Sequence, residues 1–398
     1  MIYVDSANKI KLLIIKENPM KTITLNGLKV SLGKPVVIGE GVGHFWFPCS
    51  ADRFPTGEIL VRWQICPDSG SNLVSGCVNA LSADEGATWP FRYDTAANPL
   101  LRLARADGTI AGTGFRGPAD PPGQARRMRF HYIVLSEGGR RYTLEPNSVF
   151  IDSFPRDLAR SQHEGKWSRE WPLGLAMNPD SVRQGNAVLA TPYVTYAGEK
   201  QPCVVAIESL DEGRSWKYVS QVFAADALPD MRDGASEASV VKLANGDLLC
   251  VARTYSKEPL IEARSSDGGR TWSAAKRIAP YSVYPCLRLM DNGTLALSTG
   301  RMGLFLWLSA GGRGDDWQMV DITAHHNSVM DANHRIRTDD NPPVPGDPAR
   351  HTTAYTQLVL LDSSRSLLIY DRYAGDPVPL DSEERSRIYA LPVRIDRT

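Results

Sequence analysis

The sequence has no excess of either charge, since 45 lysines and arginines balance 45 aspartates and glutamates in 398 residues. Without a basic field it lacks the electrostatic footprint of nucleic-acid binders, so no nucleic-acid partner is expected. No apolar run approaches about eighteen residues, and no membrane span is predicted. The sequence also lacks the histidine and cysteine spacings of metal sites, phosphate-binding glycine loops and dinucleotide fingerprints, which predicts a protein without cofactors.

The six cysteines show no paired spacing, which is typical of free thiols in a reducing compartment. Residues 9–16 (KIKLLIIK) hold only four apolar residues between lysines, and no small-residue cleavage site follows them. This stretch is too short for an export signal, so we predict a cytoplasmic protein. Secretion is the alternative if the start is assigned wrongly, and Met20 is a second candidate start.

Strand signals run through nearly the whole chain, and no stretch has a convincing helical pattern. Segments 239–254, 286–301 and 358–373 each predict a strand, a two-residue turn and a second strand. The Asn-Gly pairs at 245–246 and 292–293 supply the left-handed positions that a tight hairpin needs. The spread of 33 glycines and 27 prolines agrees with the many turns of an all-β fold.

A motif of the form S-x-D-x-G-x-[ST]-W recurs at residues 82–89 (SADEGATW), 209–216 (SLDEGRSW) and 265–272 (SSDGGRTW). Residues 309–317 (SAGGRGDDW) form a decayed copy with an insertion, and residues 161–167 (SQHEGKW) a shorter one. The intervals suit four-stranded units of about 40–50 residues, longer where a loop is inserted. The repeats therefore predict a β-propeller.

The residues of this motif predict a structural role. The aspartate can accept hydrogen bonds from its own turn, the glycine takes the left-handed position, and the tryptophan folds back under the hairpin. Asp84, Asp211 and Asp267 are accordingly expected to staple turns and not to take part in catalysis.

These repeated Asp-boxes resemble those of the sialidase (neuraminidase) superfamily, whose fold is a six-bladed β-propeller of four-stranded antiparallel blades. The resemblance extends over residues 35–398 and implies a single catalytic propeller at 34–398. Residues 1–33 are expected to be a tail, partly disordered or supplying a closing strand. Pairing of a strand near 29–38 with one at 387–395 would close the ring and hide both sheet edges.

The resemblance also implies a chemistry. Sialidases cleave a sugar whose anomeric carbon carries a carboxylate, using three arginines and a tyrosine nucleophile activated by a glutamate. Arginine suits the carboxylate because its planar fork donates two parallel hydrogen bonds. The segment ASEASVVKLANGDLLCVART is similar to the family segment that assigns Glu237 as the base and Arg253 as one carboxylate-binding arginine. A strand cap and a solvated strand end are the alternatives.

Two later segments extend this set. LALSTGRMGLFLWLS is similar to the strand with another clamp arginine, here Arg301. TTAYTQLVLLDSSRSLLIYDRY is similar to the segment with the nucleophile, which assigns Tyr355, with a core aromatic as the alternative. Asp371 matches a family position that usually holds a glutamate orienting an arginine. Arg264 and Arg288 are predicted to face outward.

The general acid is expected in a loop of the first blade, between a first strand and the strand that leads to the first Asp-box. The family carries its acid/base aspartate there, which points to Asp68 in RWQICPDSGSNLVSGC, with Asp52 as the alternative. Pro-Asp-Ser-Gly is also an ordinary turn sequence.

The sequence departs from the family at its first arginine, where the segment FWFP has Trp46. Tryptophan can stack on a sugar face but cannot bind a carboxylate in bidentate fashion. His44 could donate one hydrogen bond, and Arg53 or Arg62 could reach in from other positions. Residues 325–351, polar and proline-rich, could form a wall of the pocket or a surface loop.

We therefore predict a sialidase-like retaining exo-glycosidase that takes a terminal sialic acid or a related acidic sugar from a glycan. Two alternatives stay open: a glycosidase for another terminal sugar, and a non-catalytic glycan-binding propeller. The sequence does not determine the oligomeric state.

Overall fold

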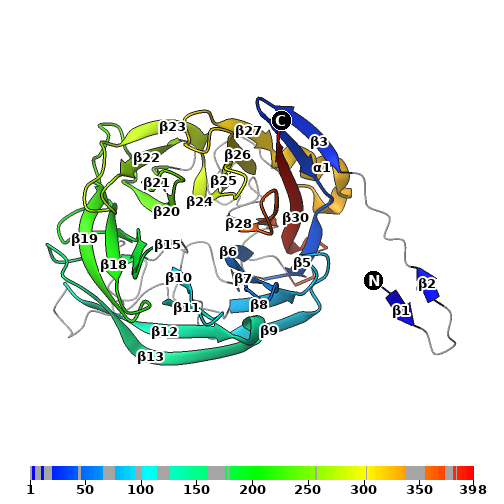
Figure 1. Cartoon of the computed structure of the whole chain (residues 1–398), viewed down its shortest axis with the longest axis horizontal. Coiled ribbons are helices and arrows are strands. Elements are labelled where there is room, and N and C mark those ends of the chain that lie inside the picture. Colours follow the sequence, from blue (N-terminus) through cyan, green and yellow to red (C-terminus); the bar gives the residue numbers. More distant parts are fainter. Residues whose placement is uncertain are drawn as a thin grey trace.

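The structure is a computed structural model of the chain. It describes residues 2–4, 10–12, 20–43, 46–65, 77–95, 101–113, 126–159, 175–176, 180–255, 258–301, 303–337, 355–372, 380–381 and 383–398. Figure 1 shows antiparallel sheets standing in a ring around a common axis, with the first strand of each unit next to the axis and the later strands toward the rim. This is a propeller arrangement. Outside the ring, β1 (Ile2–Val4) pairs with β2 (Ile10–Leu12).

In the described part of the chain, three sheets are four-stranded units whose consecutive strands are neighbours. Their members are β6 (Trp46–Arg53), β7 (Ile59–Ile65), β8 (Cys77–Ser82) and β9 (Phe91–Thr95); β20 (Ser236–Lys242), β21 (Leu248–Arg253), β22 (Pro259–Ser265) and β23 (Lys276–Tyr281); β24 (Val283–Leu289), β25 (Leu295–Gly300), β26 (Phe305–Ser309) and β27 (Gln318–Asp321). Neighbouring sheets cover both faces, so β25 and β26 are buried at every position.

A larger sheet joins two such groups. One group is β10 (Leu101–Ala104), β11 (Ile110–Thr113), β12 (Met128–Ser136) and β13 (Arg141–Asp152), and the other is β15 (Ser181–Gln184), β16 (Ala187–Ala190), β18 (Cys203–Ser209) and β19 (Ser215–Phe223), with β14 (Leu175–Ala176) and β17 (Tyr193–Val194) paired beside them. Among the described strands, the two groups are paired through one short parallel contact, between Phe150–Asp152 and Ser215–Lys217.

The last sheet closes the ring with both ends of the chain. Its strands are β28 (Thr356–Leu360), β29 (Arg365–Arg372), β30 (Ser386–Arg397), β5 (Val36–Gly41), β4 (Leu28–Leu32) and β3 (Lys21–Leu25). The predicted closure is confirmed, but two early strands provide it: β5 pairs with the first half of β30 and β4 with the second. The predicted tail at 1–33 thus contributes β3 and β4 to this sheet.

The motif turns have the predicted staple contacts. In the copy at 265–272, Ser265 Oγ donates to Asp267 Oδ1 and accepts from the Gly269 amide, both at 2.8 Å. Thr271 Oγ1 donates to Asp267 Oδ2 at 2.6 Å, and Trp272 Nε1 donates to the Gly269 carbonyl at 3.2 Å. The copies at 82–89 and 209–216 repeat this pattern. Gly269 has φ +87°, and a Cβ there would collide with Leu189.

The decayed fourth copy keeps the serine, aspartate and glycine contacts with its aspartate moved, but the indole nitrogen of Trp317 is buried without a hydrogen bond to any described residue. Ser309 Oγ donates to Asp316 Oδ1, Gly311 N donates to Asp316 Oδ2 at 3.0 Å, and Gly314 N donates to Ser309 Oγ at 3.0 Å. In this copy the accepting carboxylate, Asp316, follows the glycine of the motif, whereas in the other copies the aspartate precedes the glycine. The short copy at 161–167 lies outside the described residues.

The hairpins form where predicted, but their turns differ. Leu243 N donates to Asp247 O and Gly246 N to Leu243 O, which leaves a three-residue connection. Only Gly246 has positive φ, at +93°. The hairpin around Gly293 has the same form. The chain therefore uses a type I turn with a left-handed glycine, not a two-residue turn.

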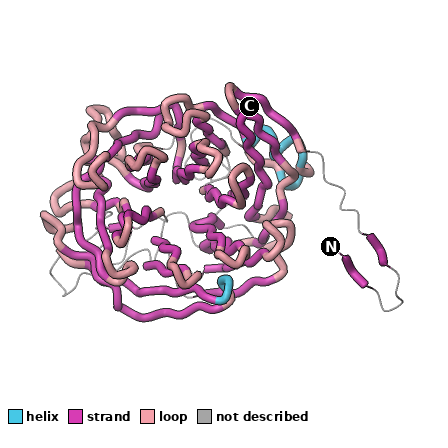
Figure 2. The backbone as a smooth tube through the Cα atoms, in the orientation of Figure 1, coloured by secondary structure: helices cyan, strands magenta, loops and turns pink. Residues whose placement is uncertain are grey.

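The expectation of no helix is wrong for one segment, α1 (Ile322–Val329), which packs beside the closing sheet (Figure 2). Asp321 caps it by accepting the Ala324 amide at 2.8 Å. This helix of about two turns buries Ile322 and His326. Residues 325–329 of this helix belong to the polar stretch 325–351, for which the sequence predicted a loop. Short 3-10 turns occur at η1 (Glu137–Gly139) and η2 (Ala332–His334).

His326 is buried in a fixed neutral tautomer. Its Nε2 lies 2.9 Å from the His334 carbonyl, which can only accept, so Nδ1 accepts from the Tyr370 hydroxyl at 2.8 Å. Burial, the largest cause, lowers the pKa of His326 to about 4. The ring therefore stays uncharged at neutral pH.

Buried charges join the inner strands near the axis. Asp52 of β6 binds Arg62 of β7, and its Oδ1 accepts from Arg102 Nη1 of β10 at 2.6 Å. The side chains of the two arginines are 0% and 6% exposed. Burial opposes the charge of Asp52, but Arg102, Arg62 and Arg288 outweigh it and lower its pKa.

Asp180, just before β15, continues these contacts across the axis. Its Oδ1 lies 2.8 Å from Arg288 Nη1 of β24 and 3.9 Å from Arg102 Nη2, while its Oδ2 accepts the Ser239 hydroxyl of β20. Arg288 Nε donates to the Leu358 carbonyl of β28 at 3.1 Å. Each sheet of the ring thus contributes. We call this set the axial network: Asp52, Arg62, Arg102, Asp180, Ser239 and Arg288.

The prediction that Arg288 faces outward is wrong, because its carboxylate partner lies 108 residues away in the sequence. As predicted, five cysteines form no disulfide in the described part of the chain, and Cys66 lies outside it; the five, all buried, are Cys49, Cys77, Cys203, Cys250 and Cys286. The described helices are all too short to cross a lipid bilayer.

Removing one buried charge of the axial network should be costly. Asp180→Asn leaves Arg288 without its counter-ion, and we expect a loss of about 3–5 kcal/mol in the free energy of unfolding by urea denaturation. The matched control is Asp157→Asn, whose exposed pair with Arg126 is worth under about 1 kcal/mol. Equal losses in the two variants would contradict a structural role for the network.

Acid should destabilise the fold through His326. Between pH 6.5 and about 4 the unfolded chain binds a proton there that the folded chain does not, so stability falls as the pH drops through this window. His326→Gln should therefore lose less stability between pH 7 and pH 4, by up to about 3 kcal/mol in urea titrations. His131→Gln, at a partly exposed ring, is the control; matching pH dependence in both variants would count against the assignment.

Candidate active site

The direction of the strands brings several polar and aromatic side chains together at one face of the ring. In each unit the inner strand begins, and the second strand ends, at the same edge, because consecutive strands run antiparallel. Side chains from three different units therefore meet at one end of the axis. The residues at these strand ends are Glu237, Arg253, Tyr284, Arg301, Tyr355 and Asp371.

Tyr355 and Glu237 are in direct contact. The phenol donates to Glu237 Oε1 at 2.9 Å although 118 residues separate the two. Arg253 Nη1 donates to the same oxygen at 3.0 Å, and the Tyr284 amide donates to Oε2 at 3.1 Å. Glu237 is only 9% exposed. Donors on both oxygens fix a carboxylate that is placed to receive the phenol proton.

Burial and the neighbouring carboxylate keep the phenol of Tyr355 protonated. Burial raises the pKa of Tyr355 well above its ordinary value, the Glu237 carboxylate raises it further, and Arg301 and Arg253 oppose these effects. Burial disfavours the charge of Arg253, but Glu237 outweighs it and raises the pKa of that guanidinium. The phenol can thus release its proton to Glu237 only as its oxygen bonds to another atom.

Asp371 holds the backbone of Tyr355. Its Oδ1 accepts the Tyr355 amide at 2.9 Å, and the residue is fully buried at the end of β29. Arg301 also lies near this tyrosine, with its guanidinium carbon 6.0 Å from the centre of the Tyr355 ring. The tyrosine is therefore fixed at both its backbone and its hydroxyl.

Strained backbone concentrates at this face. Glu237, Tyr284 and Arg301 have φ of +46°, +51° and +61°, and Ser282 has +92°. The first two lie in β-bulges, where the pairing register shifts between Ser236 and Ser239 and between Val283 and Cys286. Bulges re-aim side chains, and strain of this kind is typical of functional sites.

Sequence reasoning missed Tyr284, although a signal was present. Glu237 precedes Gly246 of its hairpin by nine residues, and Tyr284 precedes Gly293 of the next hairpin by the same interval. The two positions are equivalent in neighbouring sheets. Aligning the hairpins on their glycines would have found it.

The structure describes only some of the other predicted residues. Asp68 and His44 lie outside the described residues, and of Trp46 only the backbone is described, at the start of β6 opposite Ile65. Asp52, the alternative acid, belongs to the axial network, where its lowered pKa keeps it ionised and unsuited to donate a proton. Arg53 donates to the Leu361 carbonyl.

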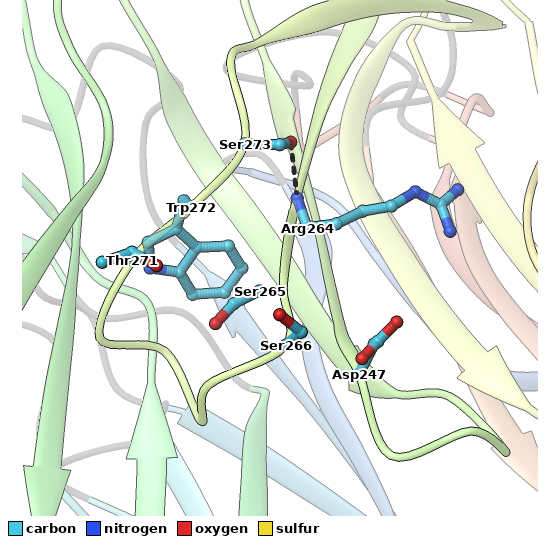
Figure 3. A pocket seen from close by; sticks show the side chains of 7 residues that line it. All are labelled: Asp247, Arg264, Ser265, Ser266, Thr271, Trp272 and Ser273. Carbon is cyan, nitrogen blue, oxygen red and sulfur yellow. Dashed lines mark hydrogen bonds between the residues drawn. The ribbon is translucent and has the colours of Figure 1, made fainter.

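A cavity of about 450 Å³ lies at the opposite ends of these strands, beside the motif turn between β22 and β23 (Figure 3). It is lined by Asp247, Arg264, Ser265, Ser266, Thr271, Trp272 and Ser273. Several of its polar groups already bond within the turn, as Ser273 Oγ does in accepting the Arg264 amide at 3.1 Å. The cavity is formed by the motif turn itself and lies away from Tyr355 and Glu237.

Comparison with known proteins bears on the fold. No family model and no curated protein matches the chain. A Dyadobacter fermentans protein of unknown function is 19% identical, with a TM-score of 0.60 over 94% of this chain and 100% of its own. A Hadza microbial sialidase is 13% identical, with a TM-score of 0.57 over 86% of this chain and 64% of its own.

A Penicillium chrysogenum α-L-arabinanase is 15% identical, with a TM-score of 0.56 over 90% of this chain and 98% of its own. At these identities the likeness shows a shared propeller fold, and function has to be argued from the site.

Proposed function

We propose that the protein is a retaining exo-glycosidase of the sialidase type, with Tyr355 as the nucleophile and Glu237 as its base. The observation that carries the proposal is the 2.9 Å hydrogen bond from the Tyr355 phenol to Glu237 in a buried setting. A tyrosine whose only task is packing needs no oriented carboxylate, and a pure glycan binder has no use for one.

The proposed ring has six blades. The ten-stranded sheet divides naturally at the short parallel contact between β13 and β19, which leaves two units that each follow the order of the four-stranded sheets. Together with the three four-stranded sheets and the closing sheet, this division supports six units about the axis.

The proposed reaction has two displacement steps. Tyr355 Oη bonds to the anomeric carbon as its proton passes to Glu237, and the bond to the leaving oxygen breaks as that oxygen takes a proton from Asp68. Water then attacks the same carbon, giving one proton back to Asp68, while the phenolic oxygen leaves and recovers its proton from Glu237. Two inversions retain the configuration. No cofactor takes part.

The proposed substrate is a glycan ending in a sialic acid or a related acidic sugar. A neutral phenol approaches such a sugar without the repulsion that a carboxylate nucleophile would suffer. Arg253 and Arg301 flank Tyr355 and would bind the sugar carboxylate.

The first test is release of 4-methylumbelliferone from its sialoside. Tyr355→Phe should lower kcat by about 10³-fold or more, because the nucleophilic oxygen is gone. Tyr196→Phe, at a buried tyrosine that follows β17, should keep the wild-type rate. Full activity of Tyr355→Phe would rule out the assignment, and failure of the unmutated protein on every glycoside, with glycan binding retained, would favour a non-catalytic propeller.

A second candidate is a glycosidase for a sugar without the anomeric carboxylate. It is favoured by Trp46 at the position of the family's first arginine and by the engagement of nearby guanidiniums: Arg53, Arg62 and Arg102 all donate to protein acceptors. Arg253 also bonds Glu237. The anomeric carboxylate of a sialic acid would then have fewer arginines available to bind it than in the sialidase family.

Trp46→Arg discriminates between the two candidates. If the missing arginine sets the substrate, the variant should raise kcat/KM on the sialoside by about tenfold or more relative to neutral aryl glycosides, since a bidentate charged contact contributes about 1.5–3 kcal/mol. Trp46→Lys is the control, because it adds the charge without the fork. An unchanged ratio for Trp46→Arg would count against this second candidate.

A further inference from the structure

Tyr284 contacts both members of the Tyr355–Glu237 pair. Its ring stacks on Tyr355 with centroids 4.1 Å apart and an interplanar angle of 18°. Its amide donates to Glu237 Oε2 at 3.1 Å. Its hydroxyl donates to the Cys49 carbonyl of β6 at 3.2 Å. One residue thus ties the phenol, the carboxylate and a third unit of the ring together.

The backbone of Tyr284 is strained in a way that serves these contacts. A bulky aromatic residue at φ +51° is a genuine outlier. In regular pairing its amide would point into the ladder, but the bulge of β24 turns it toward Glu237. Ser282 donates to the carbonyls of Gly300 and Arg301, which locks the bulge from the other side.

We propose that Tyr284 is a positioning residue that fixes the Tyr355 ring with its own ring and the Glu237 carboxylate with its amide. As far as it concerns turnover, the inference rests on the proposed function. The stacked ring covers one face of the phenol, so the phenol cannot swing away from Glu237 and water cannot reach that face.

Tyr284 is not a second nucleophile. Its hydroxyl is held by a carbonyl, and it faces β6 and not Glu237. Burial, followed by the proximity of other ionisable groups, raises its pKa well above the ordinary value, so the phenol stays neutral. Its part in the site is the placement of the two groups that react.

A test without substrate uses protein labelled with 3-fluorotyrosine. The ¹⁹F resonance of Tyr355 is the one missing from Tyr355→Phe. Tyr284→Leu should move this resonance, because the ring current of the stacked partner is lost, and should lower its titration midpoint, because the phenol is less buried. Tyr284→Phe should leave both near the wild-type values. Leucine and phenylalanine are both unbranched at Cβ, so the two variants carry a similar cost at φ +51°.

The kinetic test separates positioning from packing. Tyr284→Leu should lower kcat by about 10- to 100-fold with KM within about threefold, and Tyr284→Phe should recover most of the loss. Tyr196→Leu is the control for removal of a buried ring elsewhere; it should lower the unfolding temperature without moving the Tyr355 resonance.

The outcomes distinguish this inference from the proposed function. An unmoved Tyr355 resonance in Tyr284→Leu, or a raised KM with unchanged kcat, overturns the positioning role. If the wild-type protein turns over no glycoside while the fluorine results are as expected, the proposed function fails and the positioning of Tyr355 by Tyr284 stands.

Discussion

The axial network is the constraint on which the geometry of the site depends. Ser239 lies two residues after Glu237 on β20, and it accepts the Leu287 amide of β24 at 2.9 Å. Arg288 of β24 in turn donates to Leu358 on β28, the strand that follows Tyr355. The strands that carry or directly follow Glu237, Tyr284 and Tyr355 are therefore bonded to one another close to these three residues. A site assembled from separate sheets needs such a connection, since apolar faces alone permit small slides between sheets.

The buried charges of the axial network contribute more to the exact placement of the strands than to the stability of the fold. Buried ion pairs rarely stabilise a fold more than apolar residues of the same volume, because desolvation offsets their attraction. The apolar layers between sheets and the stapled turns supply the stability, and the charges fix which strand lies against which. The strained positions at Glu237, Tyr284 and Arg301 are tolerated because bonds from several strands hold them.

How much the sequence predicts depends on whether the signal is local. The motif turns are local, since serine, aspartate, glycine and tryptophan within eight residues determine their own contacts, and they gave the fold class. Glu237 and Arg253 flank one hairpin, and the resemblance of that short segment to a family segment singled both of them out. Tyr355 required the resemblance, because nothing near it in sequence reveals that Glu237 is its partner.

What the sequence did not predict has a common cause. Arg288 looked exposed because its partner Asp180 lies on another unit, and Asp52 looked like a candidate acid because Arg102 comes from a later strand. Tyr284 was not singled out, because a bulge, which is a property of strand pairing, turns it toward the site. Helix α1 was missed because a capping aspartate and packing on the closing sheet outweigh its polar composition.

The pairing of β30 with β4 and β5 also has a consequence for how the molecule is made. During synthesis the early strands leave the ribosome long before Ser386–Arg397 exists, so β5 and the unpaired side of β4 remain without their partner until all the sheets between them have been made. Contacts of such sequence separation form slowly, because a very long loop has to close first. The ring therefore becomes a single cooperative body only when its last strand arrives, and until then its first strands are open edges that other chains can join.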